Sequence, residues 1–426
     1  MSNCKIVNFW FSRNYGAILT CYALQQTLID MGHNAEVVNI MNQTWQKIYH
    51  GSFSEDFAAG HLYLTRPFKS EEDLVALNAE TDTFIVGSDQ VFRYRYYNMH
   101  GYIPYLLAFA APEKRKIACS ASFGLLEHDA PAPESEIFKY NLRQFEGVSV
   151  REDAGVDILA RLGIRATQII DPVFYPDMAV WNRLADENTV STPEDGIVYF
   201  SLPYDAASSN PPILAHLEKK LHANIDTQKF DVKRKVVTWL DSIRKARFVV
   251  TDSFHGTCFA ILFHKPFVVL SSYPEMRSRM DQILGMLGLS DRIISPDQAD
   301  SFEFLDKDID WNHVDEVLSQ ERDRALAWLR EHLDAPIREK PADSILLNIL
   351  WRRSQKEHAV SSKLLTAMNR GPEPDHRHSA ISNCLILMKY YRYKLLSKIT
   401  SGKRRKRYVE KRSQYHEMVR QIREAR

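Results

Sequence analysis

Along the first 40 residues, two short runs of apolar residues flank a stretch in which apolar positions recur at helical spacing. Residues 4–9 are mainly apolar, apolar positions recur at helical spacing in residues 17–31 up to Gly32, and residues 35–40 form a second apolar run. We therefore predict a strand, a helix and a second strand. This order makes the two strands parallel, with a right-handed crossover.

The same rhythm continues along the chain, because further apolar runs end in short polar turns. Further strands are predicted at residues 83–86, 116–120, 147–150, 167–170, 197–201, 248–250 and 267–270. Further helices are predicted at residues 154–162, 213–221, 236–245, 257–263, 276–287 and 311–333. Residues 41–82 show no sustained period and are interpreted as an irregular insertion with one short helix near residues 71–78. Successive strands that each end in a polar turn are typical of a doubly wound α/β sheet.

A stretch rich in Pro, Asp and Glu at residues 171–196 divides the pattern into two halves. A chain of 426 residues is also too long for one core of ordinary size. We predict two α/β domains, a helical segment that packs on their core, and a linker with a basic helical tail. Their predicted ranges are residues 1–175, 176–300, 301–370 and 371–426.

The charge of the chain is concentrated at its end. Residues 401–426 contain ten Lys or Arg and three Glu, a local charge of +7, so the remaining residues carry −6 of the net +1. Nucleic-acid binding would need a basic face on the folded part, and we predict none. The tail cluster Lys403-Arg404-Arg405-Lys406-Arg407 would be drawn to anionic lipid at about 1 kcal/mol per residue. A merely solvated helical end is the alternative.

The five cysteines are widely spaced, which favours a reducing cytosol over a disulfide framework. The first residues enter a strand at once, and no apolar run approaches the roughly 20 residues needed to span a bilayer. We expect a cytoplasmic protein, with peripheral contact to the inner face of the cytoplasmic membrane through the tail as one possibility.

A polar turn between the strand at residues 248–250 and the following apolar helix is the main candidate for chemistry. It holds Thr251, Asp252, Ser253 and His255, groups that can donate, accept or carry charge. In open α/β sheets ligands bind at the carboxyl ends of strands, beside helix N-termini that attract anions. A core histidine bonded to backbone is the alternative, and the residues alone leave both open.

Two further strand ends carry charged side chains. Arg151 follows the strand at residues 147–150, where its guanidinium could hold phosphate or carboxylate, or could pair with Glu152 or Asp153 on the surface. Asp89 follows the strand at residues 83–86, and it could face a ligand or only cap a turn.

Several other chemistries lack their signatures. His376 and His378 lie in a Pro-rich linker without a nearby Cys, so exposed histidines are favoured over a metal site. Gly16 before the first helix lacks the spacing of a dinucleotide site, and we find no nucleophile elbow, Walker loop or zinc-protease helix.

Short motifs along roughly residues 4–292, taken together, resemble the polysaccharide pyruvyl transferase family. The collinear set is far more specific than any one motif. The motifs are Asn14-Tyr15-Gly16-Ala17 with Tyr22-Ala23-Leu24-Gln25, Gly87-Ser88-Asp89-Gln90-Val91-Phe92, Ser120-Ala121-Ser122-Phe123-Gly124, Ser149-Val150-Arg151-Glu152, Asp171-Pro172, Thr251-Asp252-Ser253-Phe254-His255-Gly256 and Lys265-Pro266-Phe267.

The resemblance implies two Rossmann-like domains that face a cleft, as in B-type glycosyltransferases, the first on the acceptor side and the second on the donor side. The implied activity transfers the pyruvyl group of phosphoenolpyruvate to two hydroxyls of a sugar, forms a cyclic ketal and releases phosphate. His255 would be the general acid, and Asp252 would orient His255 or a nearby N–H group. The resemblance implies Arg151 as a donor-binding residue, and we place Ser253, Gly256 and Arg279 on the donor side with it. The residues predicted to bind the acceptor are Asn14, Tyr15 and Asp89.

One position departs from the family pattern. Many relatives carry an arginine two residues before the histidine, where this chain has Ser253. We consider Arg277 or Arg279 as the replacement cation and choose Arg279. The implied reaction uses phosphoenolpyruvate as donor substrate and needs no cofactor or metal.

Two other functions remain open from the sequence. One is a nucleotide-sugar glycosyltransferase of envelope glycan synthesis on the same architecture. The other is a non-catalytic glycan-binding protein that has lost donor binding, an idea motivated by Ser253. The leading hypothesis is the pyruvyl transferase, acting in capsule or exopolysaccharide synthesis on a saccharide that could be lipid-linked.

Overall fold

The computed structural model describes residues 1–349 apart from 12–13, 41–46, 48–49, 69, 203–210, 230–233, 272–276, 299–301 and 346. The linker histidines, the basic tail and the end of the segment predicted at residues 301–370 therefore lie outside the described residues. The chain divides into two compact units. The first unit, residues 1–131 and 141–340, contains both sheets, and the second comprises residues 132–140 and 341–426. The predicted boundary near residue 175 falls between the two sheets in the sequence.

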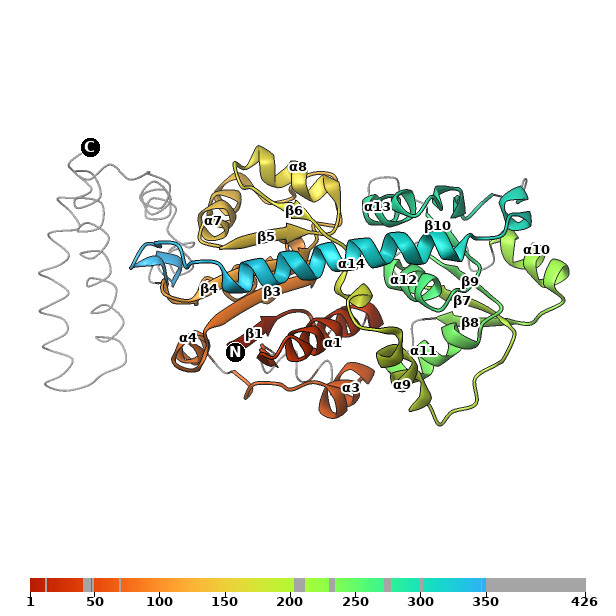
Figure 1. The fold of residues 1–426 in the computed structure, drawn as a ribbon, viewed down its shortest axis with the longest axis horizontal. Coiled ribbons are helices and arrows are strands. Elements are labelled where there is room, and N and C mark those ends of the chain that lie inside the picture. The colour runs from red at the N-terminus through yellow and green to blue at the C-terminus, as the bar shows by residue number, and fades with distance from the viewer. Residues whose placement is uncertain are drawn as a thin grey trace, which may run out of the picture. The chain divides into compact units, whose positions relative to one another are not determined.

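The first sheet consists of six parallel strands (Figure 1). Their order is β2 (Asn34–Val37), β1 (Asn3–Val7), β3 (Thr83–Asp89), β4 (Arg115–Ala121), β5 (Gly147–Val150) and β6 (Thr167–Gln168). Every residue of β3 is buried, as expected for a parallel strand covered on both faces. The helical elements of this half are α1 (Tyr15–Asp30), α3 (Phe53–His61), α4 (Glu71–Ala76), η1 (Leu77–Glu80), α5 (Tyr94–His100), α6 (Tyr102–Tyr105), α7 (Ala132–Leu142), α8 (Asp153–Arg161) and η2 (Pro172–Phe174).

The second sheet consists of five parallel strands. Their order is β11 (Ile293–Ile294), β10 (Phe267–Leu270), β9 (Phe248–Thr251), β7 (Ile197–Ser201) and β8 (Ile225–Lys229). The helical elements around it are α9 (Met178–Asp186), α10 (Pro212–Leu221), α11 (Val236–Lys245), α12 (Phe254–Leu262), α13 (Ser278–Met286), η4 (Ser290–Arg292) and η5 (Glu303–Asp306), and α14 (Trp311–Asp334) follows. In each sheet the first strand lies next to an edge strand and later strands lie on both sides of it, so the predicted doubly wound α/β class is confirmed.

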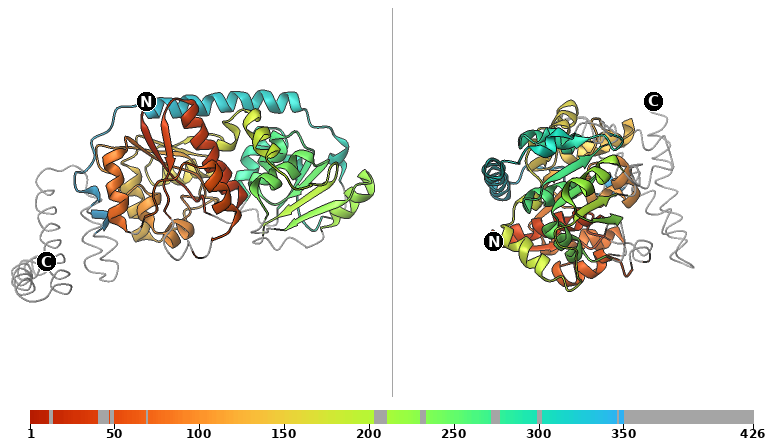
Figure 2. Two further views of the ribbon diagram at one scale, coloured as in Figure 1. Left: turned by 90° about the horizontal axis from the view of Figure 1, so that it is seen from below. Right: turned by 90° about the vertical axis from the view of Figure 1, so that its right-hand side faces the viewer.

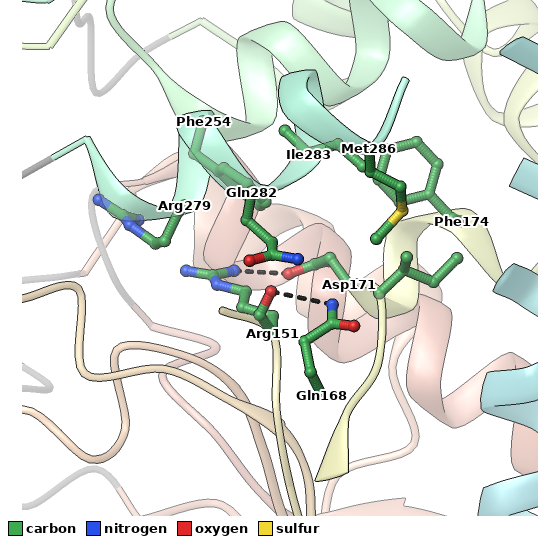
Figure 3. Close-up of a pocket in the computed structure, with 10 residues that line it drawn as sticks. Arg151, Gln168, Asp171, Phe174, Phe254, Arg279, Gln282, Ile283 and Met286 are labelled. Carbon is green, nitrogen blue, oxygen red and sulfur yellow. Dashed lines mark hydrogen bonds and ion pairs between the residues drawn. The ribbon is translucent and has the colours of Figure 1, made fainter. Parts of the chain in front are cut away.

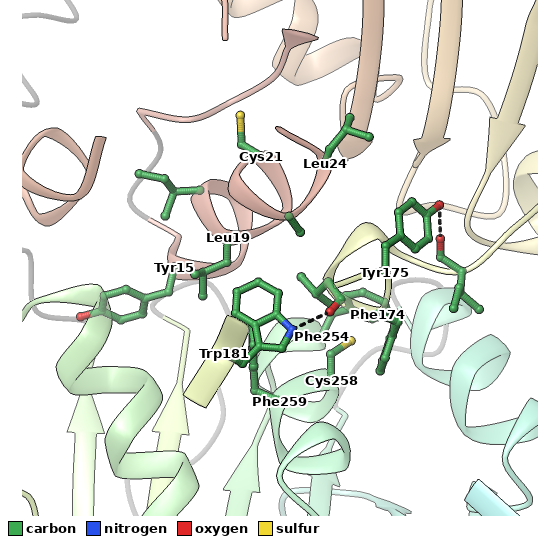
Figure 4. Packing of buried hydrophobic residues seen from close by; sticks show 14 of the residues in the cluster. Tyr15, Leu19, Cys21, Leu24, Phe174, Tyr175, Trp181, Phe254, Cys258 and Phe259 are labelled. Carbon is green, nitrogen blue, oxygen red and sulfur yellow. Dashed lines mark hydrogen bonds between the residues drawn. The ribbon is translucent and has the colours of Figure 1, made fainter. Parts of the chain in front are cut away.

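The two sheets share one hydrophobic core, which is drawn in Figure 4. Tyr15 of α1 stacks on Trp239 of α11 with ring centroids 5.1 Å apart. Trp181 of α9 meets Phe259 of α12 edge to face at 5.0 Å. Interfaces of this apolar kind hold domains in a fixed relation, whereas small polar interfaces allow motion. The shared core therefore sets how the carboxyl ends of the two sheets face each other.

Helix α14 lies along both sheets in Figures 1 and 2. Its N-cap Asp310 accepts a hydrogen bond of 3.1 Å from the backbone N–H of His313. Its buried face includes Val314, Ala325 and Leu329, spaced at helical intervals as predicted for an amphipathic helix. In the described part of the chain, no helix combines the length and apolar character that crossing a bilayer requires.

Candidate active site

Arg151 is the centre of a buried ion-pair cluster at the carboxyl end of the first sheet. It follows β5 directly, and its side chain is 1% exposed. Its Nη1 donates to Asp171 Oδ2 at 2.5 Å, and its Nη2 donates to Asp89 Oδ1 at 3.1 Å. Adjacent parallel strands end at the same edge of a sheet, which brings the ends of β3, β5 and β6 together. The strand order thus assembles the charges that the sequence places far apart.

Asp171 joins this cluster to the second half of the chain. Its Oδ1 accepts from the backbone N–H of Val173 at 3.0 Å, and its Oδ2 accepts from Ser88 Oγ at 3.0 Å. Burial alone would raise the pKa of this carboxyl, but the adjacent His255 ring and Arg151 guanidinium outweigh burial and hold the pKa below its usual range. Asp171 therefore stays ionised in the folded protein at neutral pH.

The pKa of Asp171 leads to a prediction about stability. We expect Asp171→Asn to lower the free energy of unfolding at neutral pH by roughly 3 kcal/mol, because Arg151 is left buried without one partner. Since the folded-state pKa lies below the unfolded one, this contribution is complete above the unfolded pKa of about 3.9 and is lost as pH falls through the folded pKa. Denaturant titrations should show a smaller gap between wild type and variant at about pH 3 than at about pH 7. A gap that widened on acidification would contradict the assignment.

Two residues beside the cluster adopt left-handed backbone conformations. Asp89 has φ 65° and Ser120 has φ 51°, a region that non-glycine residues rarely enter. The carbonyl of Asp89 accepts from the backbone N–H of Ser122 at 3.0 Å, and Ser120 Oγ donates to the carbonyl of Ile170 at 2.8 Å. Strained strand ends held in this way are typical of functional sites.

Glu152 fixes the turn after β4. Its Oε1 accepts from Ser122 Oγ at 2.9 Å and from the backbone N–H groups of Phe123 and Gly124 at 2.9 and 3.2 Å. Its Oε2 lies 3.9 Å from Arg151 Nε, too far for a hydrogen bond. The acid next to Arg151 in sequence therefore supports the turn and adds negative charge beside the guanidinium.

His255 faces this cluster from the first turn of α12. It is 2% exposed, and its Nε2 lies 3.7 Å from Asp171 Oδ2, close enough for an ionic interaction but longer than a hydrogen bond. The opposite side of the ring lies against α1, where a Cβ added to Gly16 would be 1.8 Å from Nδ1. The ring is thus held between α1 and Asp171, and its Nε2 has no hydrogen-bond partner among the described residues.

A pocket lies beside the ion-pair cluster and is drawn in Figure 3. Phe254 lies between two arginines, with the Arg151 Cζ 4.4 Å and the Arg279 Cζ 5.6 Å from its ring centroid. Arg279 belongs to α13, so the pocket draws on both domains. Its lining residues are Arg151, Gln168, Ile170, Asp171, Phe174, Phe254, Arg279, Gln282, Ile283 and Met286.

The two arginines at this pocket have donors without acceptors. The Nε atoms of Arg151 and Arg279 are buried and have no hydrogen-bond partner among the described residues. Burial, and then the charge of Arg151, lowers the pKa of Arg279, yet arginine remains charged in proteins. Two guanidinium groups with unused donors at one pocket favour an anion with several oxygens, such as a phosphate or a carboxylate.

A comparison with known families decides which family has this site. The family model described as polysaccharide pyruvyl transferase matches residues 14–273. The chain belongs to this family. The match contains Arg151, Asp171 and His255, whereas Arg279 lies beyond its end. Membership in the polysaccharide pyruvyl transferase family implies that the protein uses a donor and a saccharide acceptor.

Solved structures resemble the chain only distantly. MnaA of S. aureus with UDP is 11% identical with a TM-score of 0.42, covering 84% of this chain and 97% of that one. The UDP-GlcNAc 2-epimerase of Methanocaldococcus jannaschii is 12% identical with a TM-score of 0.42, covering 82% and 99%. The spinosyn rhamnosyltransferase SpnG with thymidine diphosphate is 11% identical with a TM-score of 0.36, also covering 82% and 99%. Similarity at this level says nothing about the function, and no curated protein matches the sequence.

The pyruvyl transferase turn after β9 contains Asp252. The carboxylate of Asp252 accepts from Ser201 Oγ at 2.7 Å and from the backbone N–H of Leu202 at 2.8 Å, so it closes the end of β7. The carboxylate beside His255 is that of Asp171. The bond from the Leu202 N–H agrees with the alternative that Asp252 orients a nearby N–H group, and orientation of His255 by Asp252 stays a prediction.

The other residues predicted in this turn have structural tasks. Ser253 is the N-cap of α12, and its Oγ accepts from the backbone N–H of Gly256 at 3.2 Å. At Gly256 an added Cβ would be 2.6 Å from Thr251 Oγ1, so the glycine allows the turn to pack on β9. Ser253 and Gly256 thus shape the α12 N-terminus that carries His255, and their donor-binding roles stay predictions.

The three predicted acceptor-binding residues are also accounted for by the fold. Asn14 is the N-cap of α1, and its side chain accepts from the backbone N–H of Gly16 at 2.9 Å. Tyr15 is 1% exposed in the shared core, and its hydroxyl donates to the carbonyl of Arg234 at 3.1 Å. Asp89 pairs with Arg151. The acceptor-binding roles of Asn14, Tyr15 and Asp89 stay predictions.

Arg279, which the sequence analysis chose over Arg277, lines the pocket, and other residues at the site were not chosen from the sequence. Arg277 pairs with Asp281 one turn along its helix, with Nε to Oδ1 at 2.9 Å, whereas Arg279 lines the pocket. The missed residues are Asp171 and Gly16. Both lay in motifs, and Asp171 also ends a strand in the same polar-turn pattern as Arg151, a signal that could have identified it.

Proposed function

We propose that the protein transfers the pyruvyl group of phosphoenolpyruvate to a sugar residue of a cell-surface polysaccharide or its lipid-linked precursor, forming a cyclic ketal and releasing phosphate. The observation that carries this proposal is that Arg151 and Arg279 line one pocket together with Asp171, whose Oδ2 lies 3.7 Å from His255 Nε2. Family membership supplies the pyruvyl transfer, and the charges of the pocket suit a donor that is a phosphate ester and a carboxylate.

Donor binding is assigned to the two arginines. Arg151 comes from the first domain and Arg279 from the second, so a donor held by both spans the interface. Asp171 and Asp89 fix the orientation of Arg151 by taking its Nη groups and leave its Nε unused. The apolar wall of Ile170, Phe174 and Met286 would exclude water from the reacting carbon and strengthen each electrostatic contact.

The proton step is assigned to His255. Its Nε2, beside the ionised Asp171, donates a proton to the methylene carbon of the enol, which becomes the methyl group of pyruvate. The neighbouring carbon becomes an oxocarbenium-like centre that the first sugar hydroxyl attacks. The ionised carboxylate of Asp171 lies beside the ring that donates this proton.

The remaining steps complete the ketal. The bond from the former enol carbon to the phosphate oxygen breaks, and the second sugar hydroxyl forms the second C–O bond. One hydroxyl proton restores His255 to its acid form, and the other leaves on phosphate, so two C–O bonds form, one breaks and protons balance. Arg151 and Arg279 stabilise the negative charge of the departing phosphate.

The same arrangement accounts for the serine at position 253. An arginine there is common in relatives, but here Ser253 caps α12 and the second cation comes from α13. The N-cap of α12 and the second cation are thus provided by two different residues, Ser253 and Arg279. Arg279 reaches the pocket from the same domain as His255.

The two arginines of α13 allow a matched test. Arg279→Gln is expected to raise the dissociation constant of phosphoenolpyruvate by about 10- to 150-fold, because charge-assisted hydrogen bonds are worth 1.5–3 kcal/mol. Arg277→Gln, which removes an exposed cation paired with Asp281, should bind within about twofold of wild type. Isothermal titration calorimetry measures both. Equal losses in the two variants would argue against a specific role for Arg279.

The location and membrane contact of the protein stay predictions. The basic tail at residues 371–426 lies outside the described residues. A cytoplasmic enzyme with a peripheral tail fits an acceptor that is lipid-linked, but the pocket chemistry holds for a soluble acceptor as well.

A further inference from the structure

Helix α14 is anchored on the second domain at its start. The Trp311 ring stacks on the His264 ring with centroids 4.8 Å apart and an angle of 16°. His264 Nε2 lies 2.8 Å from Asp315 Oδ1, one turn further along the helix. His264 follows α12, the helix whose first turn carries His255. The start of α14 is therefore attached beside the element that positions the proposed acid.

The other end of α14 contacts both strands that lead to the first-domain residues of the site. His332 lies against Gly147, the first residue of β5, where an added Cβ would be 2.2 Å from His332 Cδ2. Arg324 reaches Gln168, the last residue of β6, and donates from Nη1 to its carbonyl at 2.9 Å and from Nη2 to its side-chain Oε1 at 2.8 Å. Arg324 is itself held by Glu321, with Nε to Oε2 at 3.0 Å.

Gln168 contacts both Arg324 and the pocket residue Arg151. Its Nε2 donates to the backbone carbonyl of Arg151 at 3.3 Å, and the residue lines the pocket in Figure 3. An amide side chain has one acceptor end and one donor end. Because Arg324 occupies the oxygen of Gln168, the NH₂ group is directed to Arg151. A planar guanidinium that makes two bonds to one residue fixes orientation as well as distance.

We infer that Arg324 is a positioning residue for Arg151, acting through Gln168. The inference rests on the proposed function, because its readout is the binding of phosphoenolpyruvate. Arg324 lies outside the pocket lining and is 44% exposed, so it acts on the donor only through the residues it holds. The same helix is also attached to His264, which follows the end of α12 opposite His255, so α14 contacts elements that lead to both halves of the site.

The test compares arginines two residues apart on α14. Arg324→Gln is expected to raise the dissociation constant of phosphoenolpyruvate by about tenfold, because contacting residues are coupled to this extent. Arg324→Lys keeps the charge but cannot make both bonds to Gln168, so an intermediate loss is expected. Arg322→Gln removes an exposed pair with Asp177 and should leave affinity within about twofold of wild type. If Arg324→Gln does not fold, the dissociation constant of Arg324→Lys is compared with that of Arg322→Gln instead.

A double-variant cycle separates positioning from general stability. If Arg324 acts through Gln168, then Arg324→Gln should have no further effect on phosphoenolpyruvate affinity in a Gln168→Leu background, although both single variants lose affinity. Additive losses, or an Arg324→Gln affinity equal to that of Arg322→Gln, would overturn the inference while the wild type still binds the donor. Failure of the wild type itself to bind phosphoenolpyruvate would reject the proposed function, and the inference with it.

Discussion

Replacing His255 by glutamine is expected to reduce phosphate release from phosphoenolpyruvate by about 10²- to 10⁴-fold, the usual contribution of a general acid. Glutamine fills similar space but does not deliver a proton at neutral pH. The ring it replaces is 2% exposed between Gly16 and Asp171, so the loss should be in turnover and not in the affinity for the donor. The measurement is phosphate release with a saccharide acceptor on which the wild type is active.

The control for this prediction is another histidine. His313 is exposed at the start of α14, and the structure shows its backbone N–H bound to Asp310. His313→Gln should release phosphate at the wild-type rate. Phosphoenolpyruvate titration of His255→Gln should still show binding, which separates a lost acid from a lost fold. Full activity of a folded His255→Gln protein would refute the role given to this residue.

Gly16→Ala is expected to have the second largest effect. The new Cβ would lie 1.8 Å from His255 Nδ1, far inside contact distance, and 2.0 Å from its Cγ. Either α1 or the ring must move, and the ring carries the proposed proton. We expect turnover to fall by about 10²-fold, the effect of misplacing a reacting group by about 1 Å. Overpacking should also lower the free energy of unfolding by about 1–3 kcal/mol.

A second glycine provides the matched control. Gly60 lies in α3, and a Cβ added there would meet nothing within 4 Å. Gly60→Ala should therefore keep wild-type turnover and could gain up to about 1 kcal/mol from better helix propensity. Thermal unfolding and phosphate release should be measured for both variants. If Gly16→Ala had the same turnover and stability as Gly60→Ala, the claim that the first turn of α1 holds the His255 ring in place would be wrong.

Local pattern was enough to predict the strands, most helices and the carboxyl-end location of the site. A short apolar run such as Phe248–Thr251 is typical of a parallel strand buried on both faces. The polar residues that follow the run then lie at the carboxyl end of the strand. Arg151 and His255 were identified for that reason. Strand order itself came from tertiary packing, but the repeated strand and helix units restricted it to a doubly wound sheet.

Pairings between distant residues were beyond the reach of local pattern. Asp171, which follows β6 of the other sheet, lies beside His255, a contact that the neighbouring residues of either one do not indicate. Tyr15 is a polar residue at a helix start, and only the packing of α1 on α11 buries it. Both contacts depend on the core shared by the two sheets, which leaves no periodic signal in either half.

The central claim is that the pocket lined by Arg151, Arg279 and Asp171, with His255 beside Asp171, binds phosphoenolpyruvate. The most direct test is the wild-type titration that underlies the arginine comparison, extended to UDP as a nucleotide competitor. The account predicts saturable binding of phosphoenolpyruvate that UDP does not displace and that Arg279→Gln weakens. Binding of UDP without binding of phosphoenolpyruvate would contradict the account and favour a nucleotide-sugar glycosyltransferase.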